Sequence, residues 1–141
     1  MTTAMAFGTF DLLHPGHLSY LKQAKGMGER LVVVVATDLN VEKGKGKKPV
    51  NNQEERRKKV GKIVFVDEAI IGEEKDLLKI IEKTKPEIIA LGYDQKPGEE
   101  ELAKKFLKRG IGAKIVRLKP YKEKIYKSSK IREIINSKKT V

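Results

Sequence analysis

Short apolar runs alternate along the chain with amphipathic stretches, a pattern that predicts strands and helices in turn. The clearest run, residues 31–37, reads Leu-Val-Val-Val-Val-Ala-Thr. A continuous β-branched run of this kind is typical of a central parallel strand that is covered on both faces. The same criteria predict strands at residues 4–9, 31–37, 64–71, 87–91 and 113–118.

The stretches between these runs carry apolar residues at helical spacing. In residues 17–25, Leu18 and Leu21 lie on one face of the predicted helix, and Gly26 follows as a stop signal. Further helices are predicted at 52–61, 76–83 and 99–108, and a last one is predicted to start at Ser128 or Ser129. Residues 38–50 are polar and rich in lysine and glycine, so a mobile loop is predicted there.

This alternation predicts an α/β fold: a single Rossmann-like domain over residues 1–141. Its sheet is expected to be five-stranded and mostly parallel, in the order 3-2-1-4-5, with helices on both faces. Ligands of such sheets bind beyond the carboxyl ends of the strands, where the strand order reverses. Here that point lies between the first and fourth strands. The segments expected to meet there are residues 9–17, 38–50 and 92–95 and the start of the last helix.

The charge balance adds a preference for anionic ligands. The formal net charge is +12, but Lys and Glu are interleaved, as in Glu99-Glu100-Glu101 before Lys104-Lys105, which is typical of solvated helix faces. No recognition motif accompanies the charge, so nucleic acid is not expected as the main partner. The chain contains no cysteine, which excludes disulfides and thiolate metal sites. No apolar run approaches the roughly 20 residues that span a bilayer, and the N-terminus lacks a basic signal region, so a cytoplasmic protein without membrane contact is expected.

The chain's two histidines, His14 and His17, lie at the predicted start of its first helix. Such a terminus offers unpaired N–H groups and the positive end of the helix dipole, which suit phosphate. A solvated turn or a pair of metal ligands are the alternatives, although a metal would want further ligands and the sequence offers no third histidine. The P-loop and the G-x-G-x-x-G motif are both absent, so neither common nucleotide-binding motif applies.

A second candidate phosphate site is the stretch 127–132, Lys-Ser-Ser-Lys-Ile-Arg. Hydroxyls and free N–H groups at a helix start can bind a terminal phosphate, and Lys127 or Arg132 would add charge. A plain serine N-cap is the alternative and would account for one of the two serines.

The stretch 8–17, Gly-Thr-Phe-Asp-Leu-Leu-His-Pro-Gly-His, resembles the signature of the cytidylyltransferase-like nucleotidyltransferase superfamily. Its members share a G-T-F-D start, an H-x-G-H turn and a serine/threonine-rich start of the last helix, and the resemblance extends over the whole chain. The stretch 92–96, Gly-Tyr-Asp-Gln-Lys, resembles the archaeal FAD synthase branch. In one respect the chain departs from the cytidylyltransferases, which have an arginine and a glycine several residues before the serine pair, where this chain has Tyr-Lys-Glu-Lys-Ile-Tyr at 121–126.

The resemblance implies roles for individual residues on the nucleotide side. Catalytic contacts with the triphosphate are implied for His14, His17, Lys43, Lys45, Ser128 and Ser129. ATP contacts are implied for Thr9 and Phe10, chiefly through backbone, and for Pro15, Gly16, Asp94, Tyr121 and Arg132. Several of these residues have plain alternatives. Asp94 could be a solvated carboxylate, and Lys43 and Lys45 could belong to an ordinary basic loop. Tyr121 could pack beside Pro120 instead of stacking on a ring of the substrate.

On the acceptor side, Asp11, Tyr93 and Gln95 are the candidates. Asp11 is also the one nearby carboxylate that could meet a metal, although no dedicated protein metal site is expected. Arg56 matches a recurrent arginine of the family; the alternative is an ordinary i,i+4 salt bridge.

The resemblance implies a nucleotidyltransferase that moves AMP from ATP to FMN, giving FAD and pyrophosphate by direct in-line attack. A divalent cation, Mg²⁺, is expected on the substrate phosphates, and a homodimer is implied. One alternative is a CTP-dependent enzyme acting on glycerol 3-phosphate or a similar phosphorylated alcohol. Another is a basic nucleotide- or nucleic-acid-binding protein without turnover.

Overall fold

The fold follows from a computed structural model of the chain, which describes residues 1–120. Tyr121, Ser128, Ser129, Arg132 and the predicted last helix lie outside these residues. Within them, the elements are β1 (Thr3–Gly8), α1 (Pro15–Lys25), β2 (Arg30–Val35), α2 (Asp38–Lys45), α3 (Gln53–Gly61), β3 (Glu68–Ile71), α4 (Leu78–Thr84), β4 (Ile88–Leu91), α5 (Glu99–Arg109) and β5 (Lys114–Arg117).

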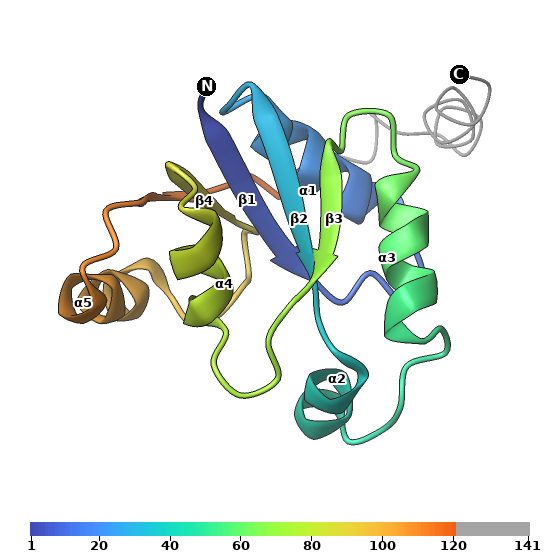
Figure 1. Ribbon diagram of the computed structural model, residues 1–141. Helices are drawn as coiled ribbons and strands as arrows, with labels where there is room; N and C mark the ends of the chain where they lie inside the picture. The colour runs from blue at the N-terminus through green and yellow to red at the C-terminus, as the bar shows by residue number, and fades with distance from the viewer. Residues whose placement is uncertain (121–141) are drawn as a thin grey trace.

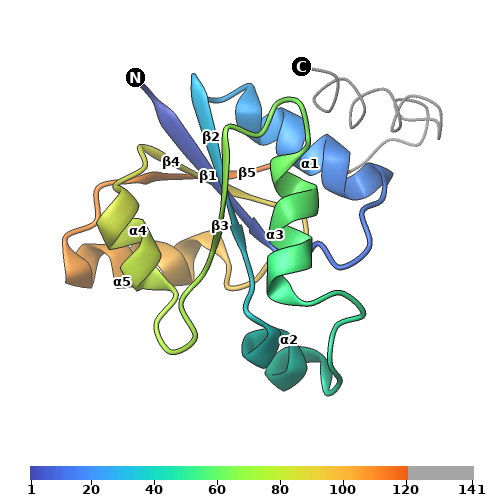
Figure 2. The same cartoon turned by 45° about the vertical axis from the view of Figure 1, so that its right-hand side comes forward.

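The five strands form one parallel sheet in the order β3-β2-β1-β4-β5 (Figure 1 and Figure 2). The predicted strand order is therefore confirmed. β1 is central and pairs with β2 along its whole length, from Thr3↔Arg30 to Gly8↔Val35. Its pairing with β4 is shorter and ends at Ala6↔Ala90. The order reverses between these two strands, so the switch point lies where it was predicted.

Helices cover both faces of the sheet (Figure 2), which explains why the strand sequences are apolar without alternation. On one face, α1 and α3 pack against Val33 and Val35. On the other, α4 and α5 pack against Val32 and Val34. Successive residues of β2 thus fill opposite cores. In residues 1–120 no helix combines the length and the apolar character that crossing a bilayer requires.

The prediction of a mobile loop over residues 38–50 is wrong for its first half, which forms α2. Thr37 caps this helix by accepting a hydrogen bond from the Asn40 backbone at 3.1 Å, and Val41 is buried beneath it. The helix ends at Gly46, whose φ of 77° is the left-handed conformation that glycine adopts readily. One cap and one anchored side chain therefore outweigh the polar composition of the segment.

The third strand is also shorter than predicted, because β3 begins at Glu68. Ile63 and Val66 lie in the turn that follows α3, yet both side chains are buried in the core beside α1 and α3. Their apolar character reflects a turn that fills the core and not a strand. The other predicted elements agree with the structure to within two residues at each end.

Candidate active site

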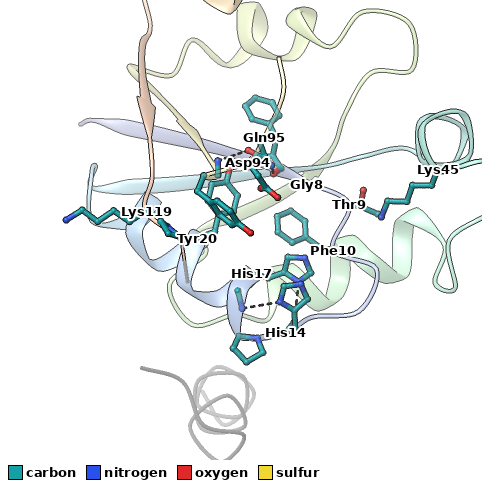
Figure 3. A pocket seen from close by; sticks show the side chains of 16 residues that line it. Gly8, Thr9, Phe10, His14, His17, Tyr20, Lys45, Asp94, Gln95 and Lys119 are labelled. Atoms are coloured by element: carbon teal, nitrogen blue, oxygen red, sulfur yellow. Dashed lines mark hydrogen bonds between the residues drawn. The ribbon is translucent and has the colours of Figure 1, made fainter. Parts of the chain in front are cut away.

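A cavity of about 770 Å³ opens at the carboxyl edge of the sheet, beside the ends of β1 and β4 (Figure 3). It gathers predicted residues from three separate parts of the chain. These are Thr9, Phe10, His14, Pro15, Gly16 and His17 from the turn after β1, Lys45 from α2, and Tyr93, Asp94 and Gln95 from the loop after β4. Asp11 and Lys43 do not line it.

His14 and His17 build the start of α1 by capping each other. The Gly16 backbone donates to Nδ1 of His14 at 3.1 Å, and the His14 backbone donates to Nδ1 of His17 at 3.2 Å. The imidazoles thus replace the serine and glutamate of an ordinary capping box. Pro15 occupies the first helical position, where its missing N–H costs nothing. As a result α1 begins two residues before the predicted start at His17.

This arrangement determines how the two rings carry their protons. Because Nδ1 accepts a hydrogen bond in both histidines, the proton of each neutral ring lies on Nε2. The rings stack with their centroids 3.7 Å apart. Burial, the neighbouring His14 and Lys45 lower the pKa of His17 to about 4, although a backbone hydrogen bond with Leu12 works in the opposite direction. At neutral pH His17 is therefore an uncharged hydrogen-bonding group.

Phe10 contributes its side chain as well as its backbone. It is 1% exposed and has a left-handed φ of 54°, which is costly for a residue with a side chain. Its ring meets His17 edge-on, with the centroids 5.2 Å apart, and it also lies close against Gly8. A Cβ at Gly8 would lie 2.6 Å from the Phe10 ring. The glycine of the G-T-F-D start is therefore required by the close approach of the phenylalanine two positions later.

Arg56 is buried completely and joins three segments around the cavity. It donates to the Thr9 carbonyl at 2.8 Å, to the Asn51 carbonyl at 3.0 Å and to the Asp38 carboxylate at 2.7 Å. The alternative of an i,i+4 salt bridge is wrong, because its carboxylate partner lies 18 positions away in the sequence. Arg56 holds the turn after β1, the start of α2 and the start of α3 in one arrangement.

Asp11 has a similar joining role. Its carboxylate accepts hydrogen bonds from the backbones of Val50 and Asn51 at 2.7 and 2.8 Å. Burial works to raise the pKa of Asp11, but the hydrogen bonds from Asn51 and Val50 and the charge of Arg56 outweigh it and keep that pKa below its usual range. Both carboxylate oxygens are engaged within the chain. Across residues 1–120, no three histidine or carboxylate side chains are grouped so that they could hold a metal ion.

The loop after β4 is held in place by the side chain of Gln95, a residue predicted from the sequence to contact the acceptor. The Gly92 backbone donates to the Gln95 carboxamide oxygen at 2.9 Å, and the carboxamide nitrogen donates to the Phe7 carbonyl at 2.7 Å. Arg117 of β5 donates to the carbonyls of Gly92 and Gln95. Tyr93 and Asp94 remain exposed at the cavity and are the residues of this loop that are open to a ligand.

Tyr20 also lines the cavity and was not predicted from the sequence. Its hydroxyl accepts from the Phe7 backbone at 3.0 Å and donates to the Ala90 carbonyl at 2.6 Å. A signal was present, because Tyr20 follows His17 by three positions and so lies on the same side of α1. Lys119 and Pro120 complete the wall. The backbone N–H and carbonyl of Lys119 are held by Gln23 of α1.

Comparison with known families and structures agrees with this geometry. Residues 5–134 match the family described as cytidylyltransferase-like. A protein of Ferroglobus placidus named FAD synthase is 46% identical over 136 residues, which cover 96% of this chain and 88% of that protein. A FAD synthase of Methanothermus fervidus is 51% identical over 122 residues, covering 84% of this chain and 83% of its own.

Among solved structures, one described as the lipopolysaccharide core biosynthesis protein from Thermoplasma volcanium GSS1 is similar, with a TM-score of 0.82 and 46% identity. The match covers 86% of this chain and 99% of that one. The family match spans most of the chain, and the relatives named FAD synthase cover most of their own length as well. The chain therefore belongs to the cytidylyltransferase-like family, in the group that contains the archaeal FAD synthases.

Proposed function

We propose that this protein transfers AMP from ATP to FMN, producing FAD and pyrophosphate. The observation that carries the proposal is the reciprocal capping of His14 and His17 at a helix start that lines the switch-point cavity. The similarity to several proteins named FAD synthase supports FMN as the acceptor. The cavity volume of about 770 Å³ lies within the range of roughly 300–1,000 Å³ that is common for ligand sites.

In the proposed reaction an FMN phosphate oxygen attacks the α-phosphorus of ATP. A new P–O bond to FMN forms as the bond between the α-phosphorus and the bridging oxygen breaks, and that oxygen leaves with pyrophosphate. Positioning and charge stabilisation supply most of the rate in such transfers. The start of α1, the Nε2–H of His14 and Lys45 are proposed to stabilise the charge on the phosphates, and His17 is proposed to hold His14 in position for this by stacking against its ring.

The remaining predicted residues are proposed to complete the two substrate sites. Tyr93 and Asp94 face the cavity, where they would contact the ribose, the base or the flavin. Ser128, Ser129 and Arg132 are retained as phosphate contacts on the strength of the sequence, since the family match includes them. ATP is proposed to enter as its Mg²⁺ complex, because Mg²⁺ keeps several waters and commonly binds through substrate phosphates.

The test supplies MgATP or MgCTP with FMN or glycerol 3-phosphate in all four combinations and follows pyrophosphate and FAD. Pyrophosphate and FAD are expected only with ATP and FMN. Turnover of CTP with glycerol 3-phosphate would establish the alternative substrate pair, and no turnover with any pair would contradict the proposed activity. The His14→Ala variant is expected to remain folded, at a cost of about 1 kcal/mol for the lost cap, and to lose about 100-fold or more in kcat.

A further inference from the structure

The pairing of β1 with β4 stops before either strand ends. Their last paired residues are Ala6↔Ala90, although β1 continues to Gly8 and β4 to Leu91. In a parallel ladder of this register, the next two hydrogen bonds would run from the Phe7 N–H to the Ala90 carbonyl and from the Gly92 N–H to the Phe7 carbonyl.

Each of these two expected bonds is replaced by a side chain inserted between the strands. The Tyr20 hydroxyl accepts from the Phe7 N–H at 3.0 Å and donates to the Ala90 carbonyl at 2.6 Å. The Gln95 carboxamide accepts from the Gly92 N–H at 2.9 Å and donates to the Phe7 carbonyl at 2.7 Å. All four backbone groups are satisfied, but none of them through the opposite strand.

We propose that Tyr20 and Gln95 are spacers that hold β1 and β4 apart at their carboxyl ends and thereby set the width of the substrate cavity. Each spacer places two hydrogen bonds in series where a ladder has one, so the strands cannot approach to the ordinary separation of about 2.9 Å between N and O. Both side chains belong to the cavity lining (Figure 3).

The spacers come from different elements, and each is itself held in place. Tyr20 projects from α1, and burial raises the pKa of its hydroxyl well above the usual value, so the hydroxyl stays protonated and able to donate. Gln95 is fixed by Arg117, which donates to its backbone carbonyl at 2.8 Å. Central strands of a parallel sheet normally satisfy their backbone groups directly. Here two side chains from separate elements replace one rung, that is, one pair of hydrogen bonds between β1 and β4. They therefore serve to keep the carboxyl ends of the two strands apart.

The opening separates the two segments that are proposed to hold the substrates. β1 leads into the His14–His17 turn, and β4 leads into the loop of Tyr93 and Asp94. The spacers thus act as positioning residues that set the distance between the phosphate side of the cavity and the side formed by Tyr93 and Asp94. This consequence for catalysis rests on the proposed function. The replacement of the inter-strand hydrogen bonds by Tyr20 and Gln95 is independent of it.

The replaced rung is tested by NMR couplings across hydrogen bonds, which report directly which carbonyl accepts from which amide. In the unaltered protein the Ala36 N–H, which donates to the Gly8 carbonyl at 2.9 Å, should give a coupling. The Phe7 N–H should give none to Ala90, and the Gly92 N–H none to Phe7. A direct coupling at either position would overturn the proposal. This measurement needs no activity, so it stands or falls separately from the proposed function.

The catalytic consequence is tested with Tyr20→Phe and Gln95→Leu, singly and together. Without the spacers the rung closes, direct couplings from Phe7 to Ala90 and from Gly92 to Phe7 arise, and the substrates are misaligned. Because a misplacement of about 1 Å can cost about 100-fold in rate, the double variant should lose on the order of 100-fold in kcat.

A matched control is Ile63→Val, which trims a buried side chain between α3 and β3, at the opposite edge of the sheet. It should lower stability without changing kcat, because it leaves the cavity untouched. A double variant that keeps the kcat of the unaltered protein at temperatures where it is folded would overturn the positioning role.

Discussion

Replacing Arg56 by methionine tests whether one buried side chain holds the cavity segments together. Methionine fills a similar volume but removes the donors that reach Thr9, Asn51 and Asp38. Hydrogen bonds from charged groups contribute about 1.5–3 kcal/mol each, and removing one partner of a buried ion pair costs about 3–5 kcal/mol. The Asp38 side chain is 41% exposed, so water can replace the guanidinium there. The two hydrogen bonds to the Thr9 and Asn51 carbonyls then dominate, and at about 1.5–3 kcal/mol each they predict a loss of about 3–6 kcal/mol in the free energy of unfolding.

The assay is urea denaturation followed by circular dichroism, with Arg57→Met as the matched control. Arg57 is the next residue of the same helix, and its ion pair with Glu54 at 2.8 Å joins two exposed or half-exposed side chains three positions apart. Such surface pairs contribute less than about 1 kcal/mol. Arg56→Lys should fall between the two, because one ammonium keeps the charge but cannot reach three acceptors in different directions. Equal stability of the Arg56→Met and Arg57→Met variants would refute the reasoning.

Three further variants probe the cavity's surroundings. Because burial depresses the pKa of His17 to about 4 from the usual 6.5, the unfolded chain binds a proton there before the folded protein does. Stability should therefore be complete above pH 6.5 and fall as the pH drops from 6.5 through 4, and the urea midpoint of His17→Gln should fall less over this range. Gly8→Ala should lower the free energy of unfolding by about 1–3 kcal/mol, and with it the melting temperature, because the new Cβ would lie 2.6 Å from the Phe10 ring. Gly44→Ala is the control: no atom lies within 4 Å of its Cβ, so this change should be neutral or stabilising. Lys45→Ala should raise the KM for ATP more than Lys43→Ala, because Lys45 lines the cavity and Lys43 does not; equal KM values would contradict this.

The fold was predictable because its determinants are local. The run 31–37 specifies a strand covered on both faces, and α1 and α5 carry apolar residues at helical spacing, so the alternation leads to the parallel sheet. The histidine turn was predictable for the same reason, since its residues are adjacent in the sequence. α2 was not predictable, because its stability depends on the cap at Thr37 and on the burial of Val41 by residues from other parts of the chain.

The residues that assemble the cavity could not be predicted in the same way. Arg56 meets Thr9 and Asp38 only after the chain has folded, and no local pattern distinguishes it from its half-exposed neighbour Arg57. Gln95 was expected beside the acceptor because its neighbours are there. Its carboxamide instead joins Phe7 and Gly92, a use that depends on where pairing between two distant strands stops.

The most direct test of the central claim follows ATP labelled at the α-phosphorus through one turnover with FMN. The account predicts that the label passes entirely into FAD, with one pyrophosphate released for each FAD and no label attached to the protein, because FMN attacks the α-phosphorus directly. The His14→Ala variant should give the same products far more slowly. Label that stays in ATP or AMP in the presence of FMN, or that becomes bound to the protein, would contradict the account.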